Sequence, residues 1–222
     1  MTVLNYYDHL TRSMLKVIYP ASAAPSLKIW SVSDKASAGT VVTPAWLCQS
    51  DRQIVTAHKI NTMKETSVIT TEILSLIKEW ESKLTSLPNK TITEFRNSQN
   101  RSIKQVLGHL IDSTSNNTHR VVHMQYQQSP FSFPNYATFG NNDRWIAIHN
   151  YQNEDWQAMI QLWKYSLLHF CHIIKNVNDD KLENEWISGP DKNITFRTMI
   201  LDFPRHLKLH LNEIKELINS KP

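Results

Sequence analysis

The apolar residues of this chain recur at intervals of three and four in four segments between residues 67 and 218. Such spacing places apolar side chains along one stripe of a helix, and a stripe of this kind is buried against other helices. In the third segment the stripe alternates strictly: Trp156, Ile160, Trp163, Leu167, Phe170, Ile174 and Val177. The pattern predicts an all-α protein built as a four-helix bundle.

Capping and breaking residues set the predicted limits of the four helices. The first is expected to begin at Ser67 and to end before Pro88, and the third to begin at Asn153. The second and fourth are expected over about 102–127 and 195–218. The link over residues 129–152 is long enough to cross the bundle from end to end, so the second and third helices can run parallel.

The N-terminal quarter differs from the rest of the chain because residues 1–62 show no sustained period. We expect them to form a largely irregular extension, either poorly ordered or not part of the natural domain, with the bundle domain over residues 63–222. A secretory signal is a poor interpretation, because Tyr6, Tyr7 and Asp8 interrupt the place of its apolar core.

Composition and charge exclude several classes of protein. The net charge is +4, but residues 1–62 hold 6 basic and 3 acidic residues and the remainder 18 and 17, so no basic cluster indicates nucleic-acid binding. The apolar runs are too short to cross a membrane. Two cysteines cannot form a disulfide framework. We expect a cytoplasmic protein without nucleic-acid or membrane partners.

Histidines are the candidate functional residues, since the chain holds ten of them. Three pairs have helical spacing: His119/His123, His169/His172 and His206/His210. At about 100° per residue, the first two pairs point away from the apolar stripes, which predicts surface positions. His206 and His210 instead lie at the edge of the fourth stripe. Buried imidazoles need partners, so this last pair requires an explanation.

His109 is the third candidate ligand, because it borders the stripe of the second helix. It begins a polar line that continues through Ser113, Asn116 and Arg120. Three imidazoles from two helices would leave open positions on a divalent metal, as in a catalytic site. The alternative is structural: a surface His109, and core-edge histidines bonded to the backbone or to Glu213.

Two segments resemble motifs of the DinB/YfiT-like superfamily of bacterial four-helix bundles. Residues 102–113 (SIKQVLGHLIDS) and 205–214 (RHLKLHLNEI) match its two histidine motifs, and Trp145 matches a recurrent aromatic residue. The resemblance covers about residues 66–218. It implies an up-down-down-up bundle and a divalent metal, nickel, zinc or similar, held by the histidines at positions 109, 206 and 210.

The chain departs from the family pattern at three places. Glu213 stands where glutamine is common, which alters the surroundings of the ligands; we expect Glu213 and Ser113 to be the outer partners of the histidines. Pro204 either kinks the fourth helix or starts a new one beside His206. Residues 1–62 have no counterpart in the family core.

The resemblance favours a transferase that uses a low-molecular-weight thiol, with a metal-dependent hydrolase and a non-catalytic structural or stress-related bundle as alternatives. The metal would acidify a bound thiol or water. Asn116 and Arg120 are candidates to bind a small anionic substrate. No catalytic protein residue is expected beyond the metal site, since Cys171 has no activating partner in the sequence. A homodimer is compatible with this kind of bundle.

Overall fold

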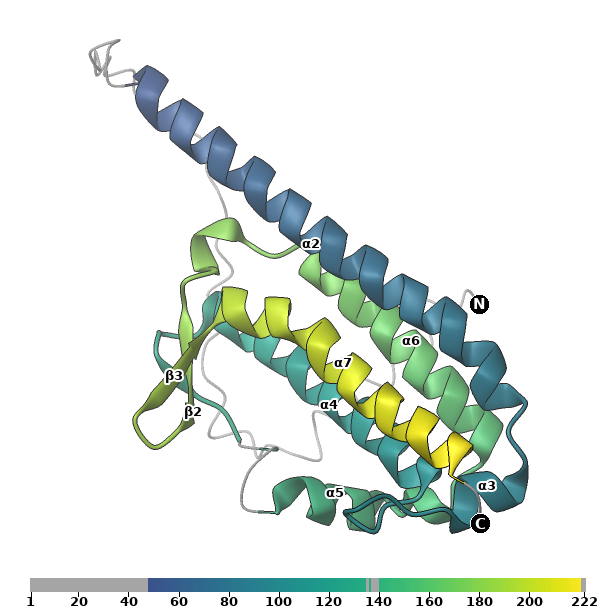
Figure 1. Ribbon diagram of the computed structural model, residues 1–222. Coiled ribbons are helices and arrows are strands. Elements are labelled where there is room, and N and C mark those ends of the chain that lie inside the picture. Colours follow the sequence, from purple (N-terminus) through teal and green to yellow (C-terminus); the bar gives the residue numbers. More distant parts are fainter. Residues whose placement is uncertain (1–47, 135, 137–139, 221–222) are drawn as a thin grey trace, which may run out of the picture. The chain divides into compact units, whose positions relative to one another are not determined.

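The computed structural model describes residues 48–134, 136 and 140–220. Four long helices dominate it (Figure 1): α2 (Cys48–Thr85), α4 (Ile103–Tyr126), α6 (Trp156–Ile174) and α7 (Phe196–Asn219). The prediction of a four-helix bundle is therefore confirmed in its main features. Within the described ranges, no helix has both the length and the apolar character of a membrane-spanning segment.

Helix α2 begins earlier than the sequence predicted, at Cys48 rather than at Ser67. Ser67 lies inside the helix, where its carbonyl accepts hydrogen bonds from the hydroxyls of Thr70 and Thr71. No proline or glycine occurs between Cys48 and Ser67, so nothing in the sequence stops the helix there. The expectation of an irregular extension falls partly on residues 1–47, which lie outside the described residues.

The predicted starts of α4 and α7 agree with the structure. The Ser102 side chain accepts a hydrogen bond from the Gln105 amide, and the Gln105 side chain accepts one from the Ser102 amide, which makes a capping box. Thr195 caps α7 by accepting from the amide of Thr198. These caps fix where the two helices that carry the candidate histidines begin.

The start of α6 was predicted incorrectly at Asn153. That residue ends a 3-10 turn over Tyr151–Asn153, and α6 begins at Trp156. Asp155 is the cap, since its carboxylate accepts from the amide of Ala158 at 2.7 Å. Two adjacent residues of capping type can compete for one helix start, and sequence spacing alone does not choose between them.

Pro204 neither ends α7 nor starts a new helix, because α7 continues from Phe196 to Asn219. Figure 1 shows α7 changing direction in its first half, as an internal proline predicts, since the ring removes one helical hydrogen bond. His206 and His210 therefore belong to one helix and lie one turn apart.

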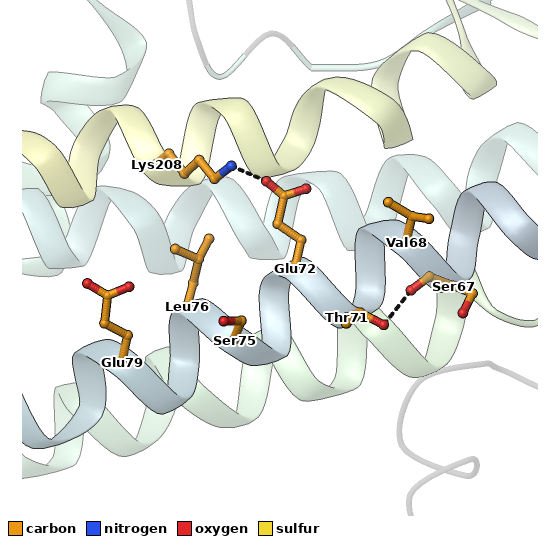
Figure 2. Close-up of a pocket in the computed structure, with 8 residues that line it drawn as sticks. All are labelled: Ser67, Val68, Thr71, Glu72, Ser75, Leu76, Glu79 and Lys208. Atoms are coloured by element: carbon orange, nitrogen blue, oxygen red, sulfur yellow. Dashed lines mark hydrogen bonds and ion pairs between the residues drawn. The ribbon is translucent and has the colours of Figure 1, made fainter.

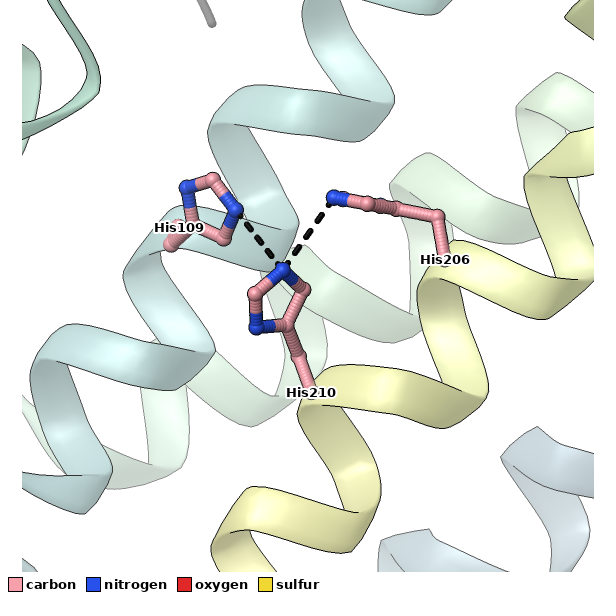
Figure 3. Close-up of side chains that lie close together, drawn as sticks. All are labelled: His109, His206 and His210. Carbon is pink, nitrogen blue, oxygen red and sulfur yellow. Dashed lines mark hydrogen bonds between the residues drawn. The ribbon is translucent and has the colours of Figure 1, made fainter. Parts of the chain in front are cut away.

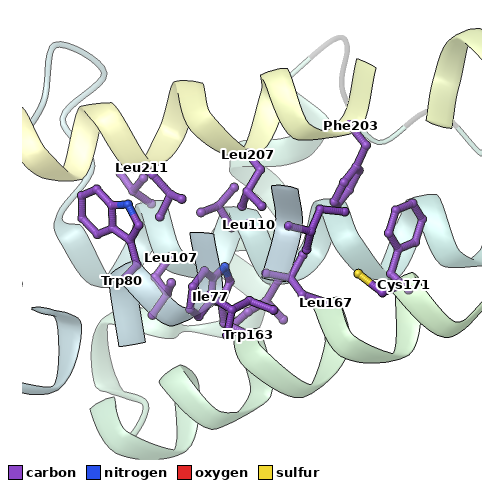
Figure 4. Close-up of a cluster of buried hydrophobic side chains, with 14 of the residues drawn as sticks. Ile77, Trp80, Leu107, Leu110, Trp163, Leu167, Cys171, Phe203, Leu207 and Leu211 are labelled. Carbon is purple, nitrogen blue, oxygen red and sulfur yellow. The ribbon is translucent and has the colours of Figure 1, made fainter. Parts of the chain in front are cut away.

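The core lies where the four apolar stripes meet (Figure 4). Trp163 and Leu167 of α6 are fully buried with Leu107 of α4. Leu207 and Leu211 of α7 lie on the opposite side of the cluster and are also buried. Full burial of one such side chain contributes roughly 1.5–3 kcal/mol, so these stripes supply the main stabilisation of the bundle.

Smaller elements that the sequence analysis did not predict join the long helices. They are α3 (Asn89–Glu94), β1 (Phe131–Ser132), α5 (Asn141–His149), β2 (Glu185–Gly189) and β3 (Lys192–Thr195). Strand β2 pairs antiparallel with β3 and parallel with β1. A small three-stranded sheet thus accompanies the bundle, and the link over residues 129–152 carries β1, α5 and the 3-10 turn. These elements are too short to show a period.

Hydrogen bonds connect the ends of the long helices. The Ser102 hydroxyl at the start of α4 donates to Gln152 Oε1, just before α6, at 2.6 Å. At the same end the Trp156 indole donates to the carbonyl of Leu84, near the end of α2, at 2.9 Å. Beyond the other end of α4, the Asn184 amide donates to the carbonyl of Met124. These contacts hold α2, α4 and α6 in register.

Candidate metal centre

Helices α4 and α7 bring three histidine side chains together (Figure 3). His210 lies between the other two: its Nε2 is 3.1 Å from Nε2 of His109 and 3.1 Å from Nε2 of His206. Each residue offers one nitrogen, and the three nitrogens lie within 4.8 Å of one another. His109 and His210 are buried and His206 is half-buried.

The cluster has the donor set that a divalent metal requires. Zinc binds imidazole nitrogen at about 2.0–2.1 Å, so two nitrogens on one tetrahedral ion lie about 3.3 Å apart. Two of the three separations, at 3.1 Å, are close to this value, and the third is at most 4.8 Å. Three nitrogens from two helices would leave at least one coordination position open, unlike a closed structural site with four protein ligands.

The second ring nitrogen of each histidine faces an outer partner. Nδ1 of His109 lies 2.7 Å from the hydroxyl of Tyr136, and Nδ1 of His206 lies 3.4 Å from the hydroxyl of Ser113. Nδ1 of His210 lies at ion-pair distance, 3.2 Å, from the Glu213 carboxylate but makes no hydrogen bond. A hydrogen bond at Nδ1 fixes a ring and leaves its Nε2 lone pair for a metal, and His109 and His206 have such a bond. Ser113 and Glu213, the outer partners expected from the sequence, are thus neighbours of His206 and His210.

Glu213 is held from two sides. Besides facing His210, its carboxylate accepts a hydrogen bond from the Asn97 amide at 3.3 Å. Partial burial raises the pKa of Glu213, but the contacts with His210 and Asn97 and the charge of Arg101 outweigh it and lower the pKa below its usual value. The carboxylate is thus kept ionised beside His210.

The surroundings of the cluster keep two of its imidazoles neutral. Burial, followed by the charges of His210 and His206, lowers the pKa of His109 to about 2. Burial, followed by the charges of His210 and Arg205, lowers the pKa of His206 to about 4. Metals bind the neutral imidazole, so at physiological pH neither ring has to lose a proton to become a ligand.

Tyr136 borders the centre but was not assigned to it from the sequence. The Tyr136 ring is buried and stacks on His109 with ring centroids 5.6 Å apart. Burial and the nearby charge of Asp112 raise the pKa of Tyr136, so its hydroxyl keeps its proton. In the sequence Tyr136 is visible only as one of several aromatic residues of the link, which could cap the core or wall a substrate pocket, and no spacing places it beside His109.

Asn116 and Arg120 lie on the same flank of α4 as His109 and are both buried. The Asn116 amide donates to the backbone carbonyl of Asp112 at 2.9 Å. Arg120 has no carboxylate partner in the described structure, and its Nε and Nη2 atoms lack any hydrogen-bond partner. Its guanidinium stacks on Trp186 at 4.2 Å and on Phe133 at 5.4 Å, and burial lowers its pKa to about 10.

The other candidates from the sequence lie apart from the centre. His119, His169 and His172 are exposed, as predicted, whereas His123 is half-buried against the Phe131 ring. Cys171 is buried, and burial raises the pKa of its thiol to about 11, which agrees with a structural role.

A hollow of about 580 Å³ lies along α2 beside Lys208 (Figure 2). Its charged residues are Glu72, Glu79 and Lys208, and Lys208 forms an ion pair with Glu72. An exposed pair of this kind contributes little energy and provides no reactive group. This hollow is therefore not a second candidate for the chemistry.

Comparison with known proteins supports the fold. No protein-family model matches the chain, and no curated protein matches its sequence. Among solved structures, the chain is similar to YfiT from Bacillus subtilis, with a TM-score of 0.55 and 15% identity over 72% of this chain and 85% of the other. YfiT is described as a probable metal-dependent hydrolase with an unusual four-helix bundle topology. The resemblance seen in the sequence is thus confirmed at the level of the fold.

Proposed function

We propose that this protein is a metal-dependent hydrolase of small anionic molecules, with a divalent ion such as zinc or nickel held by His109, His206 and His210. One observation carries the proposal: three Nε2 atoms converge while the three Nδ1 atoms face separate partners. The hydrolase description of YfiT, whose fold is similar, supports this reaction over the alternatives.

The bound metal would supply Lewis acidity, since neutral imidazole ligands leave its positive charge undiminished. The side chains around the histidines orient the imidazole rings. Tyr136 and Ser113 each form a hydrogen bond with one ring, and Glu213 lies at ion-pair distance from the third. The low pKa values of His109 and His206 keep these two rings unprotonated.

Arg120 is the proposed anchor for the substrate. A buried guanidinium without a counter-ion is costly, and an anionic group from outside would remove that cost. Trp186 and Phe133 hold the guanidinium plane, which leaves its edge free for a carboxylate or phosphate. Arg120 lies about 16 Å along α4 from His109, so the substrate would extend over roughly three turns of the helix. Asn116 lies between them and would border the same path.

The thiol-dependent transferase implied by the family resemblance uses the same metal site. A thiol could take the open position in place of water, but none of the described side chains identifies a thiol-binding group. The non-catalytic bundle would explain the fold but leaves the buried Arg120 without a role. Hydrolysis is therefore our first choice.

The test uses the full chain purified without a histidine tag. We expect about one divalent ion per chain by elemental analysis, lost in His210→Ala and retained in His172→Ala, which removes an exposed imidazole. Carboxylate-bearing esters and amides should be cleaved by the metal-loaded protein and not by His210→Ala. Transfer of glutathione, bacillithiol or mycothiol to an electrophile without ester or amide cleavage would instead select the transferase. Full metal retention in His210→Ala would reject both.

We also propose the up-down-down-up order of the long helices. The contact between Ser102 and Gln152 supports it, because the residues that precede α4 and α6 lie together. The contact between Trp156 and Leu84 supports it as well, since it places the start of α6 beside the end of α2.

A further inference from the structure

A second cavity, of about 500 Å³, lies between α4, α6 and the segment that contains α5 and the 3-10 turn. Helix α4 contributes Ser115 and Thr118 to its wall, and α6 contributes Leu162 and Ser166. At 100° per residue, Ser115 and Thr118 lie about 120° and 180° around α4 from His109. The cavity therefore opens on a different flank of α4 from the histidine cluster.

Asp112 is the buried polar group of this cavity. The residue is 1% exposed, and its Oδ1 accepts a hydrogen bond from the Tyr151 hydroxyl at 2.6 Å and lies 3.0 Å from Nδ1 of His149. Its Oδ2 has no hydrogen-bond partner. A buried carboxylate oxygen without a donor is rare in folded proteins and requires an explanation. A donor supplied by a ligand would satisfy it.

The walls of the cavity suit a flat or apolar body that carries a positive charge. Trp145, His149 and Tyr151 form an aromatic side, with ring centroids 5.5 Å and 5.2 Å apart along that series. Leu162 adds apolar surface, and Glu154 adds a second carboxylate. Among the described residues that line the cavity, none is lysine or arginine. Aromatic faces and carboxylates together attract organic cations.

The aromatic side of the cavity is held in place by a close contact with α4. A Cβ atom at Gly108 would lie only 2.1 Å from the Tyr151 ring, so Tyr151 packs directly on the helix backbone. This packing brings the Tyr151 hydroxyl to Asp112. Only glycine permits so close an approach, which indicates that the wall beside Asp112 is a fixed part of the fold.

We propose that this cavity binds a small organic cation, an amine or amidine on an aromatic or aliphatic body, with the Asp112 carboxylate as its anchor. The cationic group would donate to Asp112 Oδ2, and the body would lie against Trp145 and Leu162. A volume of about 500 Å³ is in the range of small-molecule sites. The proposal does not depend on the metal centre or on the proposed hydrolase activity.

Burial disfavours the ionised form of the Asp112 carboxyl group. It raises the pKa of the carboxyl group, and the interactions with Tyr151, His149 and Tyr136 oppose the rise only in part. A cation beside Oδ2 would stabilise the ionised form. Lys104 of α4 is engaged elsewhere, because its ammonium group donates to the backbone carbonyl of Glu154.

Titration calorimetry on the full chain tests the proposal with benzylamine and, as a neutral probe of the same shape, benzyl alcohol. We expect benzylamine to bind about tenfold more tightly, the factor that one charge-assisted hydrogen bond supplies. Asp112→Asn should remove this preference. Glu79→Gln, which neutralises an exposed carboxylate on α2, should preserve it. Equal affinities for the two probes, or no binding of benzylamine, would overturn the proposal.

A second variant guards against a structural effect of changing Asp112. Ser115 is exposed at the cavity wall, one turn from Asp112, so Ser115→Lys would place a tethered ammonium beside the carboxylate. It should reduce benzylamine affinity about tenfold by occupying the site, whereas Ser115→Gln, with similar bulk and no charge, should reduce it much less. Undiminished benzylamine binding by Ser115→Lys would overturn the proposal.

Discussion

The histidine cluster predicts a specific loss of stability in acid when no metal is present. Burial lowers the pKa of His206 from the ordinary 6.5 to about 4, so the unfolded chain takes up a proton at this position before the folded chain does. Above pH 6.5 the imidazole is neutral in both states, so this residue does not lower the free energy of unfolding. As the pH falls from 6.5 toward 4, only the unfolded state is protonated, and the free energy of unfolding decreases. His109, with a pKa of about 2, acts in the same direction.

The size of the effect follows from these values. Between pH 7 and pH 5, a histidine with a folded pKa of about 4 destabilises the native state by about 2 kcal/mol relative to an unfolded pKa of 6.5. This is a large part of the free energy of unfolding of an ordinary domain, which is roughly 5–15 kcal/mol. Replacing the imidazole by a neutral amide in His206→Gln should remove this share of the pH dependence.

Urea unfolding in the presence of a chelator measures the effect. The difference in free energy of unfolding between the wild type and His206→Gln should change by about 2 kcal/mol between pH 7 and pH 5, with the wild type losing more. The control is His172→Gln, because His172 is exposed on α6; its difference from the wild type should remain constant. A constant difference for His206→Gln as well would refute the argument that burial keeps this imidazole neutral.

Three further predictions concern packing, charge and metal. Gly108→Ala should lower the free energy of unfolding by about 1–3 kcal/mol, because its Cβ would overlap Tyr151, whereas Gly189→Ala, with open space around the added atom, should not; equal effects in urea would contradict this. Arg120→Met should leave stability unchanged or raise it by about 1–3 kcal/mol, because the buried charge has no partner. The control is Arg101→Met, which breaks the hydrogen bond from Arg101 to the Asp143 carboxylate and should lower the free energy of unfolding. A larger decrease for Arg120→Met than for Arg101→Met would contradict the interpretation of Arg120 as an unpaired charge. Zinc at about 100 times its dissociation constant should stabilise the protein by about 3 kcal/mol in calorimetry, and no shift would argue against a metal site.

The bundle could be predicted because its four stripes have a period that only a helix produces. The stripe of α6 is buried almost throughout, from Trp156 to Ile174. Helix ends were harder to place, since the start of α6 depended on the choice between Asn153 and Asp155 as cap. The start of α2 was missed because Ser67 has the chemistry of a cap but lies within a helix that continues through it.

The sheet and the short helices could not be predicted from periodicity. Strand β1 has two residues and β3 has four, which is less than any periodic pattern needs. These elements are stabilised by contacts between distant segments, such as the pairing of Phe131 with Trp186. Propensity acts locally, so it does not reveal such contacts.

The three histidines could be singled out because rotation about a helix axis separates faces. His109, His206 and His210 border apolar stripes, and the structure brings them together. The sequence alone does not establish that their nitrogens converge on one point, because this depends on how α4 and α7 pack. Tyr136 could not be assigned, since its position beside His109 is set by the path of a link that has no period.

Anomalous X-ray diffraction from crystals of the untagged full chain grown with zinc or nickel shows whether the three histidines share one ion. We expect one strong peak at the absorption edge of the added metal, about 2.1 Å from Nε2 of His109, His206 and His210. A peak only at another place, or no peak between these three rings, would reject the metal centre.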